Sequence, residues 1–326
     1  MGETPVRRGE RPAASGPAPY LSAVVPVFEE EANVAELDRR LGAALEATGR
    51  TWEVVYVDDG SHDRSLELLR GLAAASDHVT VVQLAHNFGQ HAAILAGFEE
   101  ARGQIVITLD ADLQNPPEEI GKLVAAIEEG HDVAGGVRVD RHDSFARRLP
   151  SRIVNRIISD STGMELKDYG CMLRAYRREI VDYICRYGEN ATFVPALANL
   201  FAHSVKEVPV GHAARTGGKS KYDLRRLFHL AFDLITGFSL YPIRMVTLLG
   251  GVIAALGMGF GGFLLVRRLV VGPEAEGLFT LFAVLFVFVG LQILALGLIG
   301  QYIGRIYFEV RRRPRFVVRR IYRHEG

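Results

Sequence analysis

The stretch Trp52-Glu-Val-Val-Tyr-Val-Asp-Asp-Gly-Ser61 joins a short apolar run to a pair of carboxylates. Its first half is rich in β-branched and aromatic residues and is followed by Asp-Gly, which predicts a buried strand that ends in a turn. The same arrangement returns at Gln104-Ile-Val-Ile-Thr-Leu109, which runs directly into Asp110-Ala-Asp112. We therefore expect two strands that each end in acidic residues.

The segments around these two strands alternate between strand and helix patterns. Apolar runs predict further strands at residues 22–27 and 79–84, and helical patterns cover about residues 32–47, 65–75 and 90–101. Such alternation predicts an α/β fold with a parallel, doubly wound sheet. Ligands of these sheets bind beyond the carboxyl ends of the strands, so the two acidic clusters should converge on one crevice.

The acidic clusters suit a metal ion that carries a diphosphate. Asp110, Asp112 and Gln114 supply the hard oxygen ligands that Mg²⁺ or Mn²⁺ prefers. An ion held in this way keeps positions open for substrate phosphates. Each cluster alone is equally consistent with an ordinary loop, but two of them at the ends of two strands favour a diphosphate-containing substrate.

The composition excludes several classes of protein. The chain of 326 residues has 38 Lys plus Arg against 38 Asp plus Glu, which argues against a nucleic-acid-binding protein. Its two cysteines, Cys171 and Cys185, form neither a disulfide framework nor a zinc motif. A reduced, cytosolic setting is the simplest interpretation for most of the chain.

The C-terminal third predicts two transmembrane helices. Met245–Val266 and Gly277–Gly304 are runs of 22 and 28 residues without a charge, and about 20 apolar residues cross a bilayer. The alternative is a pair of buried helices in a soluble core, but such helices rarely lack a polar face. Arginines before the first run and throughout residues 305–326 place both termini, and with them the α/β domain, in the cytoplasm on the inner face of the membrane.

The remaining segments complete the predicted domain organisation. Residues 1–20 are rich in Pro, Ala and Arg without an apolar core, which predicts a disordered leader. The cytosolic α/β domain spans 21–222. Residues 223–244 have the pattern of an interfacial amphipathic helix, 245–304 hold the two spans, and 305–326 form a basic cytosolic tail.

Several motifs resemble those of one enzyme family. Pro26-Val-Phe-Glu-Glu30, Asp58-Asp-Gly-Ser61 and Asp110-Ala-Asp112 resemble the family 2 glycosyltransferases, which have the Rossmann-like GT-A fold. Within them, the chain is similar to the polyprenyl-phosphate glycosyltransferases from residue 21 to residue 320. The strings that carry this similarity are Asn87–Ile94, Asp110–Glu119, Asp168–Arg177 and Ser220-Lys221-Tyr222. The family usually has Tyr-Asn where this chain has Phe28-Glu29, which removes a hydroxyl and an amide near the nucleotide pocket.

The resemblance implies a role for each motif position. Donor-binding residues would be Pro26, Phe28, Glu30, Val57, Asp58, Asp59, Asp110, Lys219 and Lys221, and the metal ligands Asp110, Asp112 and Gln114. The acceptor phosphate would meet Arg138, Arg147 and Ser151. Catalysis would rest on Asp112, Asp168 and Arg215, with Arg215 in a lid formed by residues 215–222. Asp168 would act as a base or orient the acceptor, and a turn-capping aspartate is an equally good interpretation.

The implied activity is a metal-dependent, inverting transfer of a sugar from a UDP-sugar to undecaprenyl phosphate at the cytoplasmic face of the membrane, for modification of the cell envelope. The sugar implied by the motifs is 4-deoxy-4-formamido-L-arabinose, with glucose or another hexose as the alternative. The resemblance also implies a homo-oligomer. A non-enzymatic transporter or flippase subunit is a more distant alternative, because two spans without internal charges offer no polar pathway.

Overall fold

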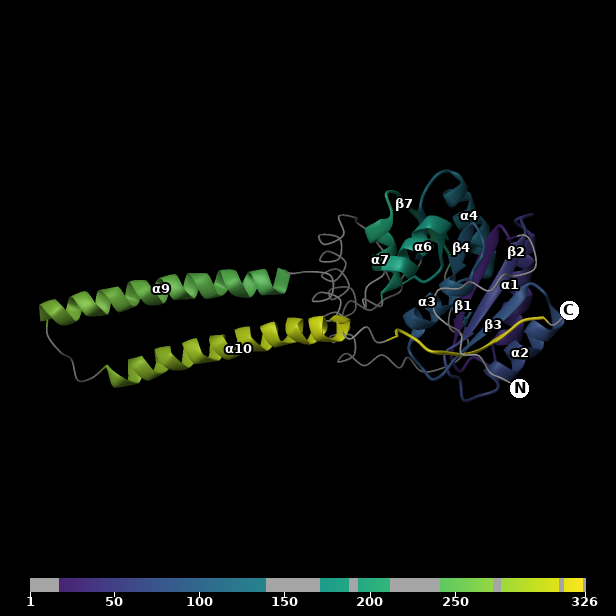
Figure 1. The fold of residues 1–326 in the computed structure, drawn as a ribbon. Coiled ribbons are helices and arrows are strands. Elements are labelled where there is room, and N and C mark those ends of the chain that lie inside the picture. The colour runs from purple at the N-terminus through teal and green to yellow at the C-terminus, as the bar shows by residue number, and fades with distance from the viewer. Residues whose placement is uncertain are drawn as a thin grey trace. The chain divides into compact units, whose positions relative to one another are not determined.

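The computed structural model describes residues 18–138, 171–187, 193–211, 241–271, 277–310 and 314–324. The chain divides into two compact units. The first, the catalytic unit, contains residues 1–224 together with residues 314–326, and the second, the helical unit, contains residues 225–313. The end of the chain therefore returns to the unit in which it began (Figure 1).

The catalytic unit is built on a mixed sheet in which eight strands are described. They lie in the order β7-β5-β6-β4-β1-β2-β3-β8. Their bounds are β1 (Leu21–Val27), β2 (Trp52–Asp58), β3 (Val79–Leu84), β4 (Ile105–Thr108), β5 (Val133–Arg138), β6 (Arg174–Arg177), β7 (Val205–Val210) and β8 (Val318–Tyr322). The described helices of this unit are α1 (Val34–Glu46), α2 (Ser65–Ala75), α3 (Gln90–Glu100), the 3₁₀ helix η1 (Pro117–Glu119), α4 (Ile120–Glu128), α6 (Arg178–Tyr187) and α7 (Val194–Phe201).

The strands and helices expected between residues 22 and 109 are confirmed, but the sheet is not wholly parallel. β1, β2, β3 and β4 are parallel, whereas β6 runs antiparallel to β4 and β8 runs antiparallel to β3. The expected basic tail thus contributes a strand to the catalytic sheet. β2 and β3 are added on one side of β1, and β4 is added on its other side, so the strand order switches between β1 and β4. Open α/β sheets bind ligands at such switch points.

Alternation along β1 directs side chains to two apolar layers. Leu21, Ala23, Val25 and Val27 belong to one core with the apolar stripe of α1, which consists of Val34, Leu37, Leu41 and Leu45. Val24 faces the other side, where α3 packs. A Cβ atom added at Gly97 of α3 would collide with Cγ1 of Val24, so this glycine lets the helix lie close to the sheet.

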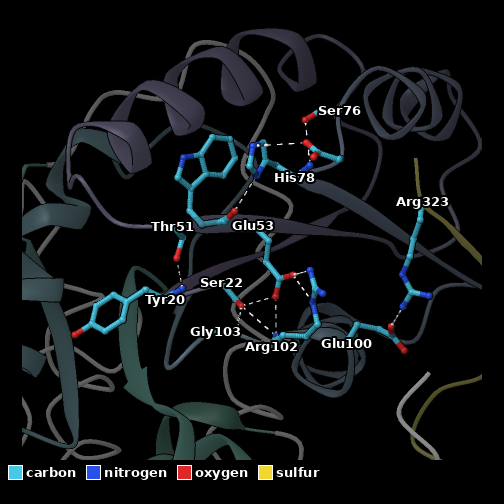
Figure 2. A network of polar contacts seen from close by, with 12 residues as sticks. Tyr20, Ser22, Thr51, Glu53, Ser76, His78, Glu100, Arg102, Gly103 and Arg323 are labelled. Carbon is cyan, nitrogen blue, oxygen red and sulfur yellow. Dashed lines mark hydrogen bonds and ion pairs between the residues drawn. The ribbon is translucent and has the colours of Figure 1, made fainter. Parts of the chain in front are cut away.

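A buried carboxylate fixes the turn between α3 and β4, at the amino ends of β1 and β2 (Figure 2). Glu53 is 4% exposed and accepts hydrogen bonds from the backbone N–H of Arg102 at 2.6 Å and from its Nε at 2.8 Å. Ser22 donates to Glu53 at 2.7 Å and accepts from the N–H of Gly103 at 2.7 Å. Each hydrogen-bond donor in this network is paired with an acceptor, and this pairing offsets the free-energy cost of burying the polar groups.

The helical unit consists, in its described part, of α9 (Tyr241–Val271) and α10 (Leu278–Val310). They lie side by side, with Gly257 of α9 facing the ring of Phe288 of α10 (Figure 1). The predicted span Met245–Val266 lies within α9, and the predicted span Gly277–Gly304 lies within α10 except for Gly277. Judged by length and apolar character together, no membrane-crossing helix is found among the residues that the structure describes. The expected leader up to residue 17 and residues 223–240 of the expected interfacial helix lie outside those residues.

Candidate active site

The candidate site lies at the carboxyl edge of the sheet, at the switch point between β1 and β4. The register pairs Val27 of β1 with Asp58 of β2 and Val24 with Thr108 of β4. Asp110 follows Thr108 by two residues and therefore leaves the sheet at about the level of Pro26. The two acidic clusters expected to share a crevice thus flank the same strand end.

Asp59 holds together two loops of the site. Its carboxylate accepts hydrogen bonds from the backbone N–H groups of Phe88 at 2.8 Å and Gly89 at 2.9 Å, and the residue is 2% exposed. Gly60 has φ +74°, and a Cβ there would lie 2.7 Å from the carbonyl carbon of His86. The glycine is needed both for the backbone angle and for the close approach of the loops.

Asp58 lies deeper than its neighbour. It is fully buried; its Oδ1 accepts from the N–H of Ser61 at 3.3 Å, and no described residue donates a hydrogen bond to its Oδ2. Burial raises the pKa of both Asp58 and Asp59, and their hydrogen bonds offset part of that rise. Both carboxylates act as internal supports in this structure, and their contact with a nucleotide stays a prediction.

The loop after β1 is fixed by two serines, one in the loop after β2 and one at the start of α2. The N–H of Glu29 donates to Ser61 at 3.1 Å, and the N–H of Glu30 donates to Ser65 at 2.9 Å. Glu29 has φ +55°, which is unusual for a residue other than glycine. Pro26 and Phe28 are half-buried beside this turn, whereas Val57 is fully buried against α3 and has no side-chain surface to offer a ligand.

The second acidic loop presents Asp110 and Asp112, both of them half-buried. Asp110 receives a hydrogen bond on Oδ1 from the side-chain amide of Gln90, and one on Oδ2 from that of Asn115 at 3.3 Å. Asp112 accepts from the N–H of Gln114 at 3.1 Å. Leu113, which follows Asp112, has φ +60°. The loop after β1, with Glu29, and the loop after β4 therefore each contain one strained non-glycine residue.

Gln90 and Asn115 are site residues to which the sequence analysis assigned no role. Gln90 begins α3, and Asn115 is 4% exposed beside the thiol of Cys171, whose Sγ lies 3.7 Å from its Oδ1. Both residues lie inside the motif strings Asn87–Ile94 and Asp110–Glu119. Their position in those strings was the available signal, but a neutral amide, unlike a carboxylate, does not by itself indicate a metal-binding role.

The other predicted residues divide into two groups. The backbone of Arg138 ends β5, which is parallel to β4 and separated from it by β6. Arg147, Ser151, Asp168, Arg215, Lys219 and Lys221 lie outside the described residues, as does the lid that residues 215–222 were expected to form. Within the described ranges, no three His, Cys, Asp or Glu side chains gather as a metal-binding group. A metal ion at Asp110 and Asp112 would therefore depend on amide, water or substrate oxygens for its remaining ligands.

The mixed α/β sheet, with acidic residues after β2 and β4, agrees with the fold expected from the motifs, and sequence comparison assigns the chain to a family of enzymes. Residues 22–185 match Glycosyl transferase family 2, and the chain belongs to that family. It is therefore a glycosyltransferase, as its motifs predicted.

The similarity to two relatives extends over almost the whole chain. A protein of Salmonella paratyphi A is 50% identical over 310 residues, which is 94% of this chain and 95% of that one. A protein of Pseudomonas paraeruginosa is 53% identical over 311 residues, or 94% of this chain and 91% of that one. Both carry the name undecaprenyl-phosphate 4-deoxy-4-formamido-L-arabinose transferase.

A solved structure supports the fold. Mannosyl-3-phosphoglycerate synthase from Rubrobacter xylanophilus superimposes with a TM-score of 0.50 at 15% identity, over 70% of this chain and 74% of the other. At this identity the likeness concerns the fold alone, and it agrees with the predicted GT-A architecture.

Proposed function

We propose that this protein transfers 4-deoxy-4-formamido-L-arabinose from its UDP derivative to undecaprenyl phosphate, with inversion at the sugar carbon. The observation that carries the proposal is the 50–53% identity, over 94% of the chain, to relatives named for this acceptor and sugar. The site is consistent with it, because Asp110 and Asp112 lie at the switch point where a nucleotide diphosphate would bind.

The proposed reaction has little need of a general base. The acceptor is a phosphate monoester whose second pKa is about 6, so its attacking oxygen is already ionised at pH 7. It forms a bond to the anomeric carbon of the sugar, while the bond from that carbon to the diphosphate breaks and UDP leaves with the electron pair. The enzyme must align the two phosphates in line with the sugar and stabilise the charge that develops on UDP.

The residues after β4 fit a divalent cation. Two carboxylates and a nearby amide, with waters and phosphate oxygens completing the shell, are what Mg²⁺ or Mn²⁺ uses in phosphate sites. Asp110 and Asp112, with Gln114, would hold the ion. When bound it would neutralise charge on the diphosphate, and the half-buried loop would keep both carboxylates oriented toward the leaving group.

Membrane attachment through α9 and α10 is part of the proposal. The runs Met245–Val266 and Gly277–Gly304 carry no charge, and large apolar side chains on the two helices are exposed, among them Leu256 at 69%, Leu269 at 78% and Leu281 at 64%. A bilayer is the environment in which such surfaces are stable. We propose that the catalytic unit lies on the cytoplasmic side, where the arginine distribution favours it.

The orientation can be tested by labelling. A cysteine introduced at Gly272 should react with an impermeant thiol reagent added outside intact cells, whereas one at Arg320 should react only after permeabilisation. Each is introduced after the two native cysteines have been replaced by serine. The reverse labelling pattern would refute the cytoplasmic placement.

Product analysis tests the transfer itself. The full-length protein in detergent is incubated with undecaprenyl phosphate and a panel of UDP-sugars, and the lipid products are identified by mass spectrometry. We expect a product only with the formamido sugar. A hexosyl product would replace the proposed sugar, and no lipid product with any donor would refute the proposed function.

Asp112→Asn serves as the site control in the same assay. It should abolish transfer without altering the melting temperature, because it removes a metal ligand whose own side chain is half-buried and does not belong to the apolar core. Asp77→Asn, at a side chain that is 79% exposed, is the matched substitution and should retain full activity. Full activity of Asp112→Asn would exclude the proposed metal site.

A further inference from the structure

We infer that Gln90 is a positioning residue that fixes the orientation of the Asp110 carboxylate. The inference rests on the proposed function, because the role of Asp110 as a ligand comes from it. The side-chain amide of Gln90 donates to Oδ1 of Asp110, and the amide of Asn115 donates to Oδ2 at 3.3 Å. The two donors come from different parts of the chain and hold one carboxylate from both oxygens.

The donors are chemically suited to a metal ligand. A lysine or arginine would hold the carboxylate equally well, but it would also neutralise the charge that attracts a cation. An amide orients the carboxylate and leaves its charge unchanged. Each carboxylate oxygen has two lone pairs, so one amide bond is compatible with coordination through the second. Partners of this kind commonly determine how strongly a first ligand binds its metal.

The helix that carries Gln90 is held at a defined height above the sheet. Gly97 brings α3 into contact with Val24 and Val57, and the Glu53–Arg102 network fixes the turn that follows α3 (Figure 2). At the other end, Asp59 binds the N–H of Gly89, which directly precedes Gln90. Gln90 itself is exposed, so its contact with Asp110 arises from the placement of the helix and does not come from side-chain burial.

The test measures metal binding and does not depend on turnover. Mn²⁺ is titrated into the full-length protein in detergent in the presence of UDP, and free Mn²⁺ is read by electron paramagnetic resonance. Gln90→Ala should raise the Kd for Mn²⁺ by roughly 10- to 100-fold, the usual effect of removing a residue that orients a metal ligand. Gln90→Asn keeps the amide but is one methylene shorter, and it should behave like Gln90→Ala.

A matched control separates positioning from stability. Gln83→Ala also deletes a side-chain amide, here the one that accepts from the hydroxyl of Tyr322 at 3.0 Å, and it should leave the Kd for Mn²⁺ unchanged. The melting temperature of both Gln90 variants should equal that of the wild type, because the Gln90 side chain contributes no core packing. A loss of metal affinity with an unchanged melting temperature is the signature of a positioning residue.

The outcomes distinguish this inference from the proposed function. Wild-type Mn²⁺ affinity in Gln90→Ala overturns the role of Gln90, whatever sugar the enzyme transfers. Wild-type protein that binds Mn²⁺ with UDP but forms no lipid product overturns the proposed function alone. Wild-type protein that does not bind Mn²⁺ in the presence of UDP overturns the metal site and the role of Gln90, and the product analysis then decides the proposed function separately.

Discussion

The carboxylate of Asp59 accepts a hydrogen bond from the backbone N–H of Phe88 at 2.8 Å, and so connects the loop after β2 to the loop after β3. The neighbouring N–H of Gly89 donates to its other oxygen at 2.9 Å. In the connected loop the rings of His86 and Phe88 stack with their centroids 3.8 Å apart. The conformation of the segment that leads into α3 is therefore determined by one buried side chain from another loop.

Asp59→Asn should loosen this segment. An asparagine can accept from one N–H, but its own amide hydrogens then face the second donor, so one bond is lost and a donor is left unsatisfied. We expect a loss of about 1–3 kcal/mol in the free energy of unfolding and faster protease cleavage near Asn87. Thermal unfolding followed by circular dichroism and limited proteolysis would measure both. Unchanged cleavage would show that the loop does not depend on Asp59.

Gly97→Ala should displace α3 from the sheet. The added methyl group would collide with Val24 and would lie 3.1 Å from Cγ2 of Val57. Overpacking of this kind typically costs about 1–3 kcal/mol, despite the better helix propensity of alanine. Gly121→Ala is the matched control, because nothing lies within 4 Å of a Cβ at that position in α4. It should stabilise the protein by up to about 1 kcal/mol, and the two variants should therefore shift the melting temperature in opposite directions.

His91 should make stability depend on pH below neutrality. Burial, together with the positive charge of Arg174, lowers the pKa of His91 to about 4 from an ordinary value of 6.5. Above pH 6.5 the residue is neutral in both the folded and unfolded states. Between pH 6.5 and 4 only the unfolded state takes up the proton, so the contribution of His91 to the free energy of unfolding falls by at most ~1.4 kcal/mol per pH unit.

The pH effect can be isolated by substitution. His91→Gln should flatten the fall of the melting temperature between pH 6.5 and 4, because glutamine takes up no proton. His62→Gln, at a side chain that is 84% exposed, should leave the slope of the wild type. Identical slopes in all three proteins would mean that His91 is accessible to protons in the folded state.

Tyr322 should support the edge of the catalytic sheet. Its hydroxyl donates to Gln83 of β3 at 3.0 Å, and the guanidinium groups of Arg70 and Arg320 lie 4.9 and 5.4 Å from the centre of its ring. Tyr322→Ala removes all three contacts and should lower the melting temperature by several degrees, the equivalent of about 1–2 kcal/mol. Tyr322→Phe keeps the ring and should cost less.

Hydrogen exchange would locate the effect of the tyrosine. In Tyr322→Ala the amides of β3 that pair with β8, around residues 81–84, should exchange faster than in the wild type. Tyr187→Ala is the control, because this tyrosine is 57% exposed on α6, away from that edge. Unchanged exchange at β3 would mean that β8 is held by its backbone bonds alone.

The sequence predicts the central part of the fold well for a physical reason. β1 to β4 are buried over most of their length, so each is a mainly apolar run, and α1 carries its apolar residues at helical spacing. β8 has no such signature. Its sequence Val-Arg-Arg-Ile-Tyr lies at the edge of the sheet, where charged residues are usual, and it is easily taken for a basic tail.

In the site, too, some features could be predicted from the residue pattern, whereas others depend on how the elements pack. The pattern located Asp110 and Asp112 correctly at the carboxyl edge, since position after a strand is a property of the sequence. It did not predict that Asp58 and Val57 would be fully buried, because burial depends on the loop and helix that cover them. Nor did it assign a role to Gln90, whose contact with Asp110 depends on the packing of a helix 20 residues away in sequence.

The pairing of β8 with β3 also concerns the order in which the protein is made. The ribosome synthesises β3, then β4 to β7, then α9 and α10, and only afterwards β8, which pairs with the edge of β3. Gln83 and Tyr322 are 239 residues apart. Until then a nascent chain exposes an unpaired strand edge, a surface prone to association with other chains. The final hydrogen-bonded ladder of the catalytic sheet can form only in a chain whose two long helices have already been translated. A chain that ends before or within the two helices therefore cannot complete the catalytic sheet.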